Sequence, residues 1–324
     1  MKRLYPDIGC YASGYLHTQD DIKLYYELSG NPEGIPVLYL HGGPGAGLSP
    51  NYRRFFDANR YRIIGFEQRG CGRSVPFGCT KQNTTADTLS DINALRQHLK
   101  VDKWVLFGGS WGATLALLAA IDAPETVSGL ILRGVFLARQ EDRDWFLGPE
   151  GGGAQLFPEH YEIFVDGIAP PLTPARICQW YQRSFECSDE TLRLEALKRW
   201  YIWEERLSRM SLPPGTGDVT THYPLSLVTC LAKLECHYLL NNCFLPENYI
   251  LDNLHKIGDL PGTIIHGRYD VICRTRGAWE LHKSWKNSDL HVVADAGHTT
   301  SEAGVALRLC QATRDMSRYL GAIG

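Results

Sequence analysis

The sequence lacks the features that mark several classes of protein. It has no run of 18 apolar residues, so no segment is expected to span a membrane. The basic first residues lead into no apolar stretch, and we expect no signal peptide. The formal net charge is only −3 over 324 residues, which gives no electrostatic case for nucleic acid or an anionic membrane as the main partner. We therefore expect a cytoplasmic protein.

None of the ten cysteines belongs to a C-x-x-C pair. Several lie in apolar patterns typical of helices, namely Cys178, Cys230, Cys236 and Cys243. A free cysteine behaves as a small buried hydrophobic residue, and a reducing compartment keeps it as a thiol. The cysteines are therefore expected to be free.

Short apolar runs rich in β-branched residues alternate with helix-like stretches. This alternation predicts a mostly parallel sheet with helices on both faces. Ahead of it, residues 15–17 and 22–26 flank a turn-prone Gln19-Asp20-Asp21 and predict an antiparallel hairpin at the sheet edge. The predicted strands are residues 37–40, 62–66, 104–107, 130–132, 263–265 and 290–293, and an amphipathic helix through Leu307, Met316 and Leu320 closes the chain.

The alternation is interrupted between about residues 136 and 246. This interval holds aromatic-rich helical segments at 177–185 and 192–207, and Gly/Pro-rich loops separate its helices. We expect one α/β domain made of residues 1–136 and 246–324, with residues 137–245 inserted as a helical cap. The expected loops are residues 148–153, 170–171 and 213–215.

Ser110 is the predicted nucleophile. It lies in Gly108-Gly109-Ser110-Trp111-Gly112, a G-x-S-x-G motif that follows a predicted strand and precedes a helix-forming run. This context is the nucleophile elbow of the α/β-hydrolase fold. The strained turn exposes the serine Oγ at a helix N-terminus, where free N–H groups favour negative charge, and the flanking glycines allow close packing.

A second glycine-rich loop, His41-Gly42-Gly43-Pro44-Gly45, follows the strand that ends at Leu40. In this fold that loop supplies one oxyanion N–H and the residue after the nucleophile supplies the other. The backbone N–H groups of Gly43 and Trp111 are therefore the predicted oxyanion hole. His41 is expected to make structural hydrogen bonds rather than act as a base.

The base and its orienting acid should follow the serine in the chain. His298 lies in a loop just past the last predicted strand, whereas His291 alternates within that strand and His282 lies on a helix face. Asp270 occupies the equivalent loop one strand earlier. Asp295 competes for this role, but it is expected to cap a turn. The predicted triad is Ser110, Asp270 and His298.

Longer motifs resemble the proline iminopeptidase family, and the likeness extends from about Tyr15 to the last helix. It implies a cytoplasmic serine peptidase that removes N-terminal proline from peptides without a metal or cofactor. The motifs are H-G-G-P-G-A-G at residues 41–47, Q-R-G-x-G-R-S at 68–74, G-G-S-W-G-A-T-L-A-L at 108–117, G-R-Y-D-V at 267–271, and A-G-H ending at His298.

Two cap segments, W-x-x-W-E ending at Glu204 and E-C-H-Y starting at Glu235, are similar to W-x-x-W-E and E-N-H-Y of that family. The resemblance implies that these glutamates hold the free amino terminus of the substrate. Two carboxylates can accept both N–H donors of a prolyl ammonium, and an internal peptide would leave them unpaired. From the residues alone, Glu204 beside Glu205 also fits a solvated helix face. Glu235, on an otherwise apolar helix, needs a partner.

Phe136 and Phe146 match family positions beside the cap and would line an apolar pocket for the pyrrolidine ring, although core packing explains each equally well. The chain departs from the family at Glu67, where the family has aspartate, and within E-N-H-Y-F, where this chain has Cys236 and Leu239. A less aromatic pocket could admit N-terminal alanine or hydroxyproline.

The sequence thus predicts a serine aminopeptidase that forms a prolyl acyl-enzyme. Its partners would be small peptides with a free N-terminal proline, with no nucleic acid and no membrane. A carboxylesterase or amidase acting on small neutral acyl compounds is the main alternative, but it would leave the cap glutamates without a partner. A non-catalytic binding protein is a further alternative, and it would not need an intact triad. Serine at position 110 disfavours dehalogenase or epoxide-hydrolase chemistry, which uses an aspartate nucleophile in this fold.

Overall fold

The computed structural model describes residues 4–210 and 224–323. Its strands are β1 (Cys10–His17), β2 (Lys23–Gly30), β3 (Ile35–Leu40), β4 (Tyr61–Phe66), β5 (Trp104–Gly109), β6 (Val127–Arg133), β7 (Gly262–Gly267) and β8 (Ser288–Val293). They form one sheet in the order β1-β2-β4-β3-β5-β6-β7-β8. β2 pairs antiparallel with β1 and β4, and the other pairs are parallel. The predicted mostly parallel sheet with an edge hairpin is confirmed.

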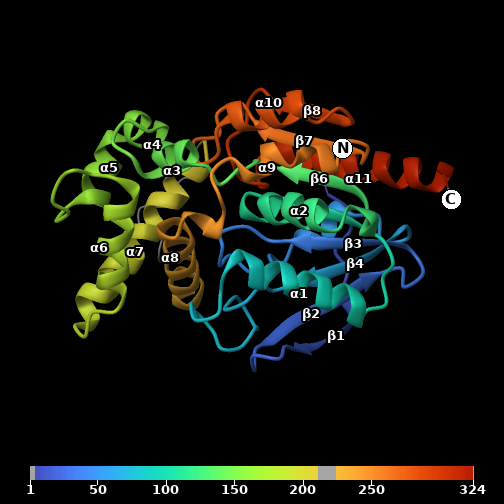
Figure 1. Cartoon of the computed structure of the whole chain (residues 1–324), viewed down its shortest axis with the longest axis horizontal. Coiled ribbons are helices and arrows are strands. Elements are labelled where there is room, and N and C mark those ends of the chain that lie inside the picture. Colours follow the sequence, from blue (N-terminus) through green and yellow to red (C-terminus); the bar gives the residue numbers. More distant parts are fainter. Residues whose placement is uncertain (1–3, 211–223, 324) are drawn as a thin grey trace.

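Helices cover both faces of this sheet (Figure 1). Alternate residues of a strand face opposite layers. Leu38 and Leu106 join the core cluster that includes α1 (Thr85–His98), α2 (Trp111–Asp122) and α10 (Thr275–Ser284). Val37 and Val105 join the cluster on the other face, under α11 (Ala303–Ile323). Both faces of the central strands β3 and β5 are therefore covered, as the unbroken apolar runs in the sequence predict.

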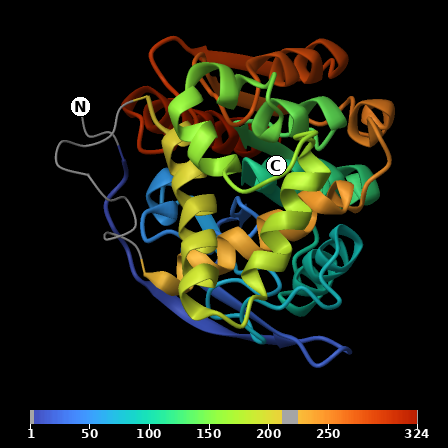
Figure 2. The ribbon, with the colours of Figure 1, turned by 90° about the vertical axis from the view of Figure 1, so that its left-hand side faces the viewer.

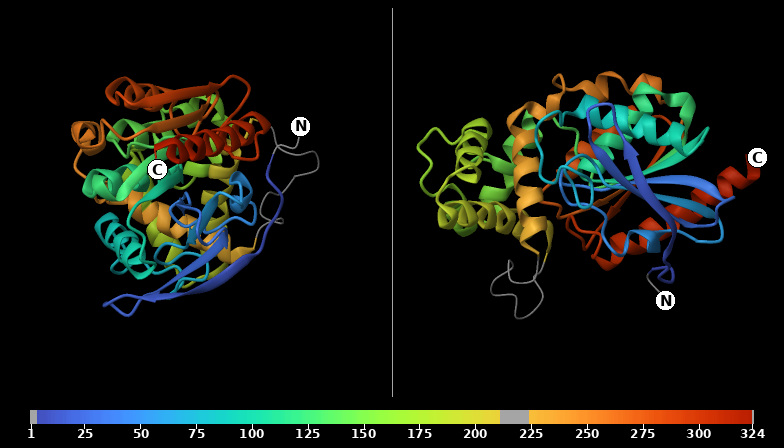
Figure 3. Two further views of the ribbon diagram at one scale, coloured as in Figure 1. Left: turned by 90° about the vertical axis from the view of Figure 1, so that its right-hand side faces the viewer. Right: turned by 90° about the horizontal axis from the view of Figure 1, so that it is seen from below.

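The described residues between β6 and β7 hold helices and loops but no strand. The helices are α3 (Gln140–Leu147), α4 (Gly152–Leu156), α5 (Pro158–Val165), α6 (Pro174–Phe185), α7 (Glu190–Ser208), α8 (Leu225–Leu240) and α9 (Tyr249–Asp252), with 3₁₀ turns η4 (Asn242–Phe244) and η5 (Leu254–Lys256). Figures 1 and 3 place α3 to α8 at one end of the sheet, and Figure 2 views that end directly. The domain boundaries at residues 137 and 245 stay a prediction.

Stacked aromatic rings form the interior of these inserted helices. Phe164 of α5 lies 5.0 Å from Tyr181 of α6 and 4.9 Å from Trp203 of α7, between ring centroids. The expected loop at residues 148–153 is wrong in part, because α4 already begins at Gly152. A Cβ there would meet the Trp145 ring at 2.1 Å, so this glycine serves close packing rather than a turn. The loop expected at residues 213–215 lies outside the described residues.

Cys178, Cys230, Cys236 and Cys243 are buried and form no disulfide, as the sequence predicts. Across residues 4–210 and 224–323, no helix is long and apolar enough to cross a membrane.

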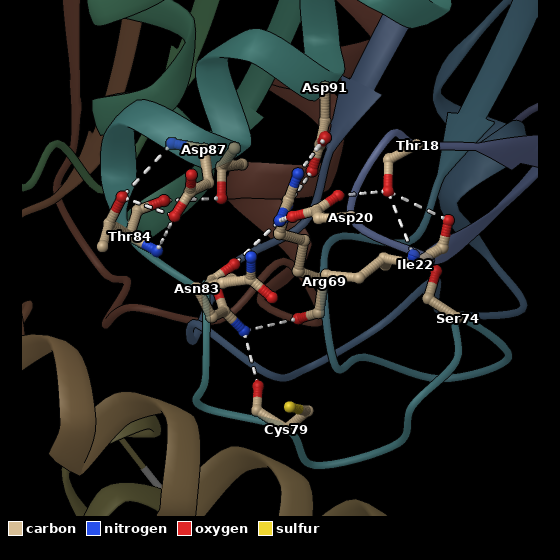
Figure 4. A network of polar contacts seen from close by, with 12 residues as sticks. Thr18, Asp20, Ile22, Arg69, Ser74, Cys79, Asn83, Thr84, Asp87 and Asp91 are labelled. Atoms are coloured by element: carbon tan, nitrogen blue, oxygen red, sulfur yellow. Dashed lines mark hydrogen bonds and ion pairs between the residues drawn. The ribbon is translucent and has the colours of Figure 1, made fainter.

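Arg69, from the Q-R-G-x-G-R-S motif, joins the edge hairpin to the rest of the core (Figure 4). Its guanidinium binds both carboxylate oxygens of Asp91 in α1, at 2.5 and 2.8 Å. It also pairs with Asp20 in the turn between β1 and β2. Arg69 and Asp91 are almost completely buried, so each needs the other as a counter-charge.

Replacing Arg69 with alanine is expected to lower the free energy of unfolding by about 3–5 kcal/mol, because the Asp91 carboxylate would be buried without a partner. Urea unfolding monitored by fluorescence measures this change. The matched control is Arg308→Ala, since Arg308 is exposed on α11. Equal losses for the two variants would contradict the prediction.

Candidate active site

Ser110 lies in a strained turn between β5 and α2. Its φ and ψ angles are 57° and −124°, a region that residues other than glycine rarely adopt. A Cβ on Gly108 would lie 2.0 Å from the Gly112 carbonyl oxygen, and one on Gly112 would lie 2.0 Å from the Leu40 carbonyl oxygen. The two glycines therefore let β5, α2 and β3 approach closely. The turn has the geometry of a nucleophile elbow.

The predicted oxyanion loop packs directly against Ser110, because a Cβ on Gly42 would lie 3.2 Å from the Ser110 Cβ. Gln68 holds this loop: its side-chain amide donates to the His41 carbonyl oxygen at 2.9 Å, and its backbone N–H donates to His41 Nε2 at 3.2 Å. Burial lowers the pKa of His41, which fits a neutral histidine with a structural role. Within the described part of the chain, the N–H groups of Gly43 and Trp111 donate to no other residue.

Asp270 follows β7, His298 follows β8, and their side chains meet: Asp270 Oδ2 lies 2.7 Å from His298 Nδ1. The other Asp270 oxygen accepts the backbone N–H groups of Ile272 and Cys273, at 3.0 and 2.8 Å. Burial alone would raise the pKa of Asp270, but the charge and hydrogen bond of His298 hold it below its ordinary value. Asp295, the competing acid, is exposed.

Arg133, at the end of β6, binds the other side of the His298 imidazole. Its Nη1 lies 2.9 Å from His298 Nε2 and donates to the His298 carbonyl oxygen at 3.0 Å. Because a guanidinium can only donate, Nε2 must accept and Nδ1 carries the ring proton. Burial lowers the pKa of His298, which keeps the ring neutral. This is the tautomer that a general base requires.

The described residues contain no hydrogen bond between the Ser110 hydroxyl and His298. Arg133 already bonds His298 Nε2, which is the nitrogen that would accept the serine proton in the predicted mechanism. Catalytic hydrogen bonds often form only once substrate is bound. The contact between Ser110 and His298 therefore stays a prediction, and it requires Arg133 to release Nε2.

Glu235 is a buried carboxyl on α8, and its Oε2 accepts the indole N–H of Trp200 at 2.6 Å. Burial raises the pKa of Glu235 to about 8, although the Trp200 bond acts against this shift. The pKa of Glu204 on α7 is also raised well above its ordinary value, first by burial and then by the charge of Glu235, while Arg133 opposes this. A bound cation would favour the ionised form of both groups.

One pocket gathers most of the predicted residues. Its lining holds the predicted nucleophile, both predicted oxyanion residues, both phenylalanines and one glutamate, namely Ser110, Gly43, Trp111, Phe136, Phe146 and Glu235. It also holds Pro44, Tyr238, Leu239, Cys243, Ile272 and Cys273. Glu204 is absent from this lining, although its pKa responds to Glu235. Phe146 also packs on Trp203, at 6.5 Å between centroids, so it belongs to the core as well as to the pocket lining, and its contact with a pyrrolidine ring stays a prediction.

Several residues around the site had no predicted role. His266 is buried in β7 with its Nε2 3.4 Å from Asp270 Oδ2, and it bonds the Cys273 carbonyl oxygen at 2.8 Å. Trp200 is the first residue of the W-x-x-W-E segment, where it had no role of its own, and Arg133 lies outside the motifs above. No sequence signal marks these three residues, because their partners lie on other elements of the fold.

Within the described ranges, one group of side chains could hold a metal ion: Asp270, Cys273 and His298, with ligand atoms within 4.8 Å of one another. Two of its members already bond each other as the predicted acid and base. The expectation of a metal-free and cofactor-free hydrolase stays a prediction.

Comparisons with known proteins agree with this geometry. A family model described as the alpha/beta hydrolase fold matches residues 35–304. A proline iminopeptidase of Arabidopsis thaliana is 41% identical over 321 residues, or 99% of this chain and 83% of the relative. One from Xanthomonas citri is 42% identical over 316 residues, or 97% of this chain and 99% of the relative.

Solved structures give the same fold. A proline iminopeptidase of Mycobacterium smegmatis matches with a TM-score of 0.60 and 17% identity, covering 95% of this chain and 100% of that chain. An esterase from Exiguobacterium antarcticum matches with a TM-score of 0.59 and 22% identity, covering 96% and 98%. With about 40% identity to curated relatives over nearly its whole length, the chain belongs to the proline iminopeptidase family of α/β hydrolases.

Proposed function

We propose that this protein is a serine aminopeptidase that releases N-terminal proline from peptides through an acyl-enzyme intermediate. The observation that carries this proposal is a buried carboxyl, Glu235, in the same pocket as the Ser110 nucleophile. A hydrolase of neutral esters has no use for an uncompensated carboxyl beside its nucleophile, because the charge is costly to bury without a partner. The ammonium group of a peptide supplies that partner.

The catalytic steps follow the triad logic. His298 Nε2 takes the Ser110 proton as Oγ attacks the prolyl carbonyl carbon, and Asp270 stabilises the imidazolium that forms. The N–H groups of Gly43 and Trp111 bind the oxyanion. The imidazolium then protonates the leaving amine, and a water molecule hydrolyses the prolyl ester.

Binding at the amino end selects the substrate. We propose that Glu235 and Glu204 accept the two N–H groups of the prolyl ammonium, while Phe136 and Phe146 contact the pyrrolidine ring. The partners are small peptides with a free N-terminal proline. The buried thiols of Cys178, Cys230, Cys236 and Cys243, which form no disulfide, support a reducing compartment such as the cytoplasm.

Blocking the substrate amine tests the proposed activity against the esterase or amidase alternative. We expect prolyl-2-naphthylamide to be cleaved with a kcat/KM at least about a hundred-fold above that of N-acetylprolyl-2-naphthylamide, because the acetylated form leaves a buried carboxylate unpaired. Ser110→Ala should remove both the cleavage and the labelling by a fluorophosphonate probe. Equal rates for the two substrates would exclude the aminopeptidase.

Glu204→Gln and Glu235→Gln should each raise KM for prolyl-2-naphthylamide by roughly ten-fold or more, since each removes a charge-assisted hydrogen bond to the ammonium. Steady-state kinetics of the purified variants measure this. Glu195→Gln is the matched control, because Glu195 lies on α7 and is 59% exposed. An unchanged KM in Glu204→Gln would rule out its proposed role.

Glu235→Gln should also stabilise the free protein at pH 8, and the gain should vanish near pH 4. The pKa of Glu235 is about 8 in the folded protein, against 4.5 for an ordinary glutamate. Between these values folding must protonate a carboxylate that is ionised in the unfolded chain, so the wild type loses stability as pH rises. Glutamine keeps an acceptor for Trp200. Thermal unfolding at pH 4, 6 and 8 tests this, and a constant difference between variant and wild type would refute it.

A further inference from the structure

Asn83 connects the core to the helix that carries Glu235. It is almost completely buried in the segment that leads into α1. Its side-chain amide donates to the carbonyl oxygens of Arg69 and Cys79, at 3.1 and 2.8 Å, as Figure 4 shows. Its Oδ1 accepts the Tyr238 hydroxyl at 2.8 Å, and its backbone oxygen accepts His237 Nε2 at 2.9 Å. One residue thus bonds two core carbonyls and two consecutive side chains of α8.

The core side of this contact is rigidly held. The Arg69 guanidinium donates to the Gln82 carbonyl oxygen at 2.8 Å, next to Asn83 in the chain. Arg69 is itself fixed by the buried pair with Asp91. Asn83 therefore sits on a part of the core whose polar groups already have partners.

The α8 side of the contact reaches the substrate pocket. Tyr238 lines that pocket, and its ring lies edge-on to Trp111, 4.9 Å between centroids. Glu235 lies one helical turn earlier and faces the same pocket. The first half of α8 packs on the core through close backbone contact, since a Cβ on Gly45 would lie 2.7 Å from the Leu231 Cα. Asn83 holds the second half.

The hydrogen bonds fix the position of α8 because they are directional, whereas apolar contacts alone would let this helix slide along the core. Burial raises the pKa of Tyr238 far above its ordinary value, so its hydroxyl remains a donor. Burial lowers the pKa of His237, so the ring is neutral and donates through Nε2. Both donors are satisfied in one position of α8 relative to the core.

We propose that Asn83 is a positioning residue for substrate selection: by fixing the second half of α8 on the core, it sets the distance between Ser110 and Glu235. A bound proline must place its carbonyl carbon at Ser110 and its ammonium at Glu235 together, so a shift of α8 by about 1 Å would weaken recognition strongly. This inference rests on the proposed aminopeptidase function.

The test compares Tyr238→Phe and Asn83→Ala with the wild type. Tyr238→Phe keeps the ring on Trp111 and removes only the hydroxyl. Each variant should lower kcat/KM for prolyl-2-naphthylamide by roughly five- to ten-fold, mainly through KM, as expected for the loss of one buried hydrogen bond. The rate at which a fluorophosphonate labels Ser110 should stay within about two-fold, because the core is unchanged. Both variants remove the Asn83–Tyr238 bond, although Tyr238→Phe also removes the 3.2 Å contact of the hydroxyl with Thr88 Oγ1 and Asn83→Ala the bonds to the Arg69 and Cys79 carbonyl oxygens. The effect of the double variant should therefore be clearly less than the sum of the two single effects.

Tyr181→Phe is the matched control. Tyr181 is also a completely buried tyrosine among the inserted helices, and its hydroxyl donates to the Phe164 carbonyl oxygen at 2.7 Å, away from Asn83. This variant should keep the wild-type KM. The proposal is overturned if Tyr181→Phe raises KM as much as Tyr238→Phe does, if neither Asn83→Ala nor Tyr238→Phe raises it, or if Ser110 labelling falls in parallel.

Hydrogen–deuterium exchange separates this proposal from the proposed function. Amides of α8 should exchange faster in Asn83→Ala and Tyr238→Phe and at the wild-type rate in Tyr181→Phe, with no substrate present. A wild type that does not cleave prolyl substrates would refute the aminopeptidase, and the exchange rates of α8 would still support or overturn the role of Asn83. Unchanged exchange in both test variants would overturn it.

Discussion

The close approach of β3, β5 and α2 around Ser110 is the constraint on which the rest of the site depends. The positions of Gly108 and Gly112 leave no room for a side chain, so three elements touch through their backbones. That contact forces Ser110 into its strained conformation and points it at the N-terminus of α2. The other predicted catalytic groups must then lie close to Ser110. They can, because the carboxyl ends of neighbouring parallel strands lie along one edge of the sheet.

The inserted helices add a second requirement, which is to hold two carboxyls, Glu235 in the pocket of Ser110 and Glu204 within electrostatic reach of Glu235, without a counter-charge of equal strength. This arrangement costs stability in the free protein, since the pKa values of Glu204 and Glu235 are raised. It favours a cationic ligand for the same reason. Functional sites often carry such a cost in stability, and the surrounding structure must be rigid enough to hold the buried carboxyls in place. We infer that the hydrogen bonds between α8 and the core provide this rigidity.

Arg133 lies between the two halves of the site. It bonds the His298 imidazole, and its charge opposes the rise in the pKa of Glu204 that burial causes, so it acts on both the proposed base and the proposed amine-binding group. In the free protein this arrangement keeps His298 in the neutral tautomer that catalysis needs. In the proposed mechanism, substrate binding at Glu204 and the release of His298 Nε2 are therefore linked through this one side chain.

The sequence by itself determined the fold class and the strained turn at Ser110, and it placed Asp270 and His298 in neighbouring loops after two strands, because these features depend on local strand–turn–helix patterns and on glycines that no other residue can replace. Within the expected loop at residues 148–153, the local pattern misread Gly152 and Gly153, which begin α4, since a glycine packed against a tryptophan looks like a turn glycine in sequence. Only the tertiary structure decided that Arg133 bonds His298, 165 positions away, and that Asn83 bonds Tyr238, 155 positions away. Neither pair has a spacing or a motif that marks it, because the position of one side chain relative to the other is set by packing between elements.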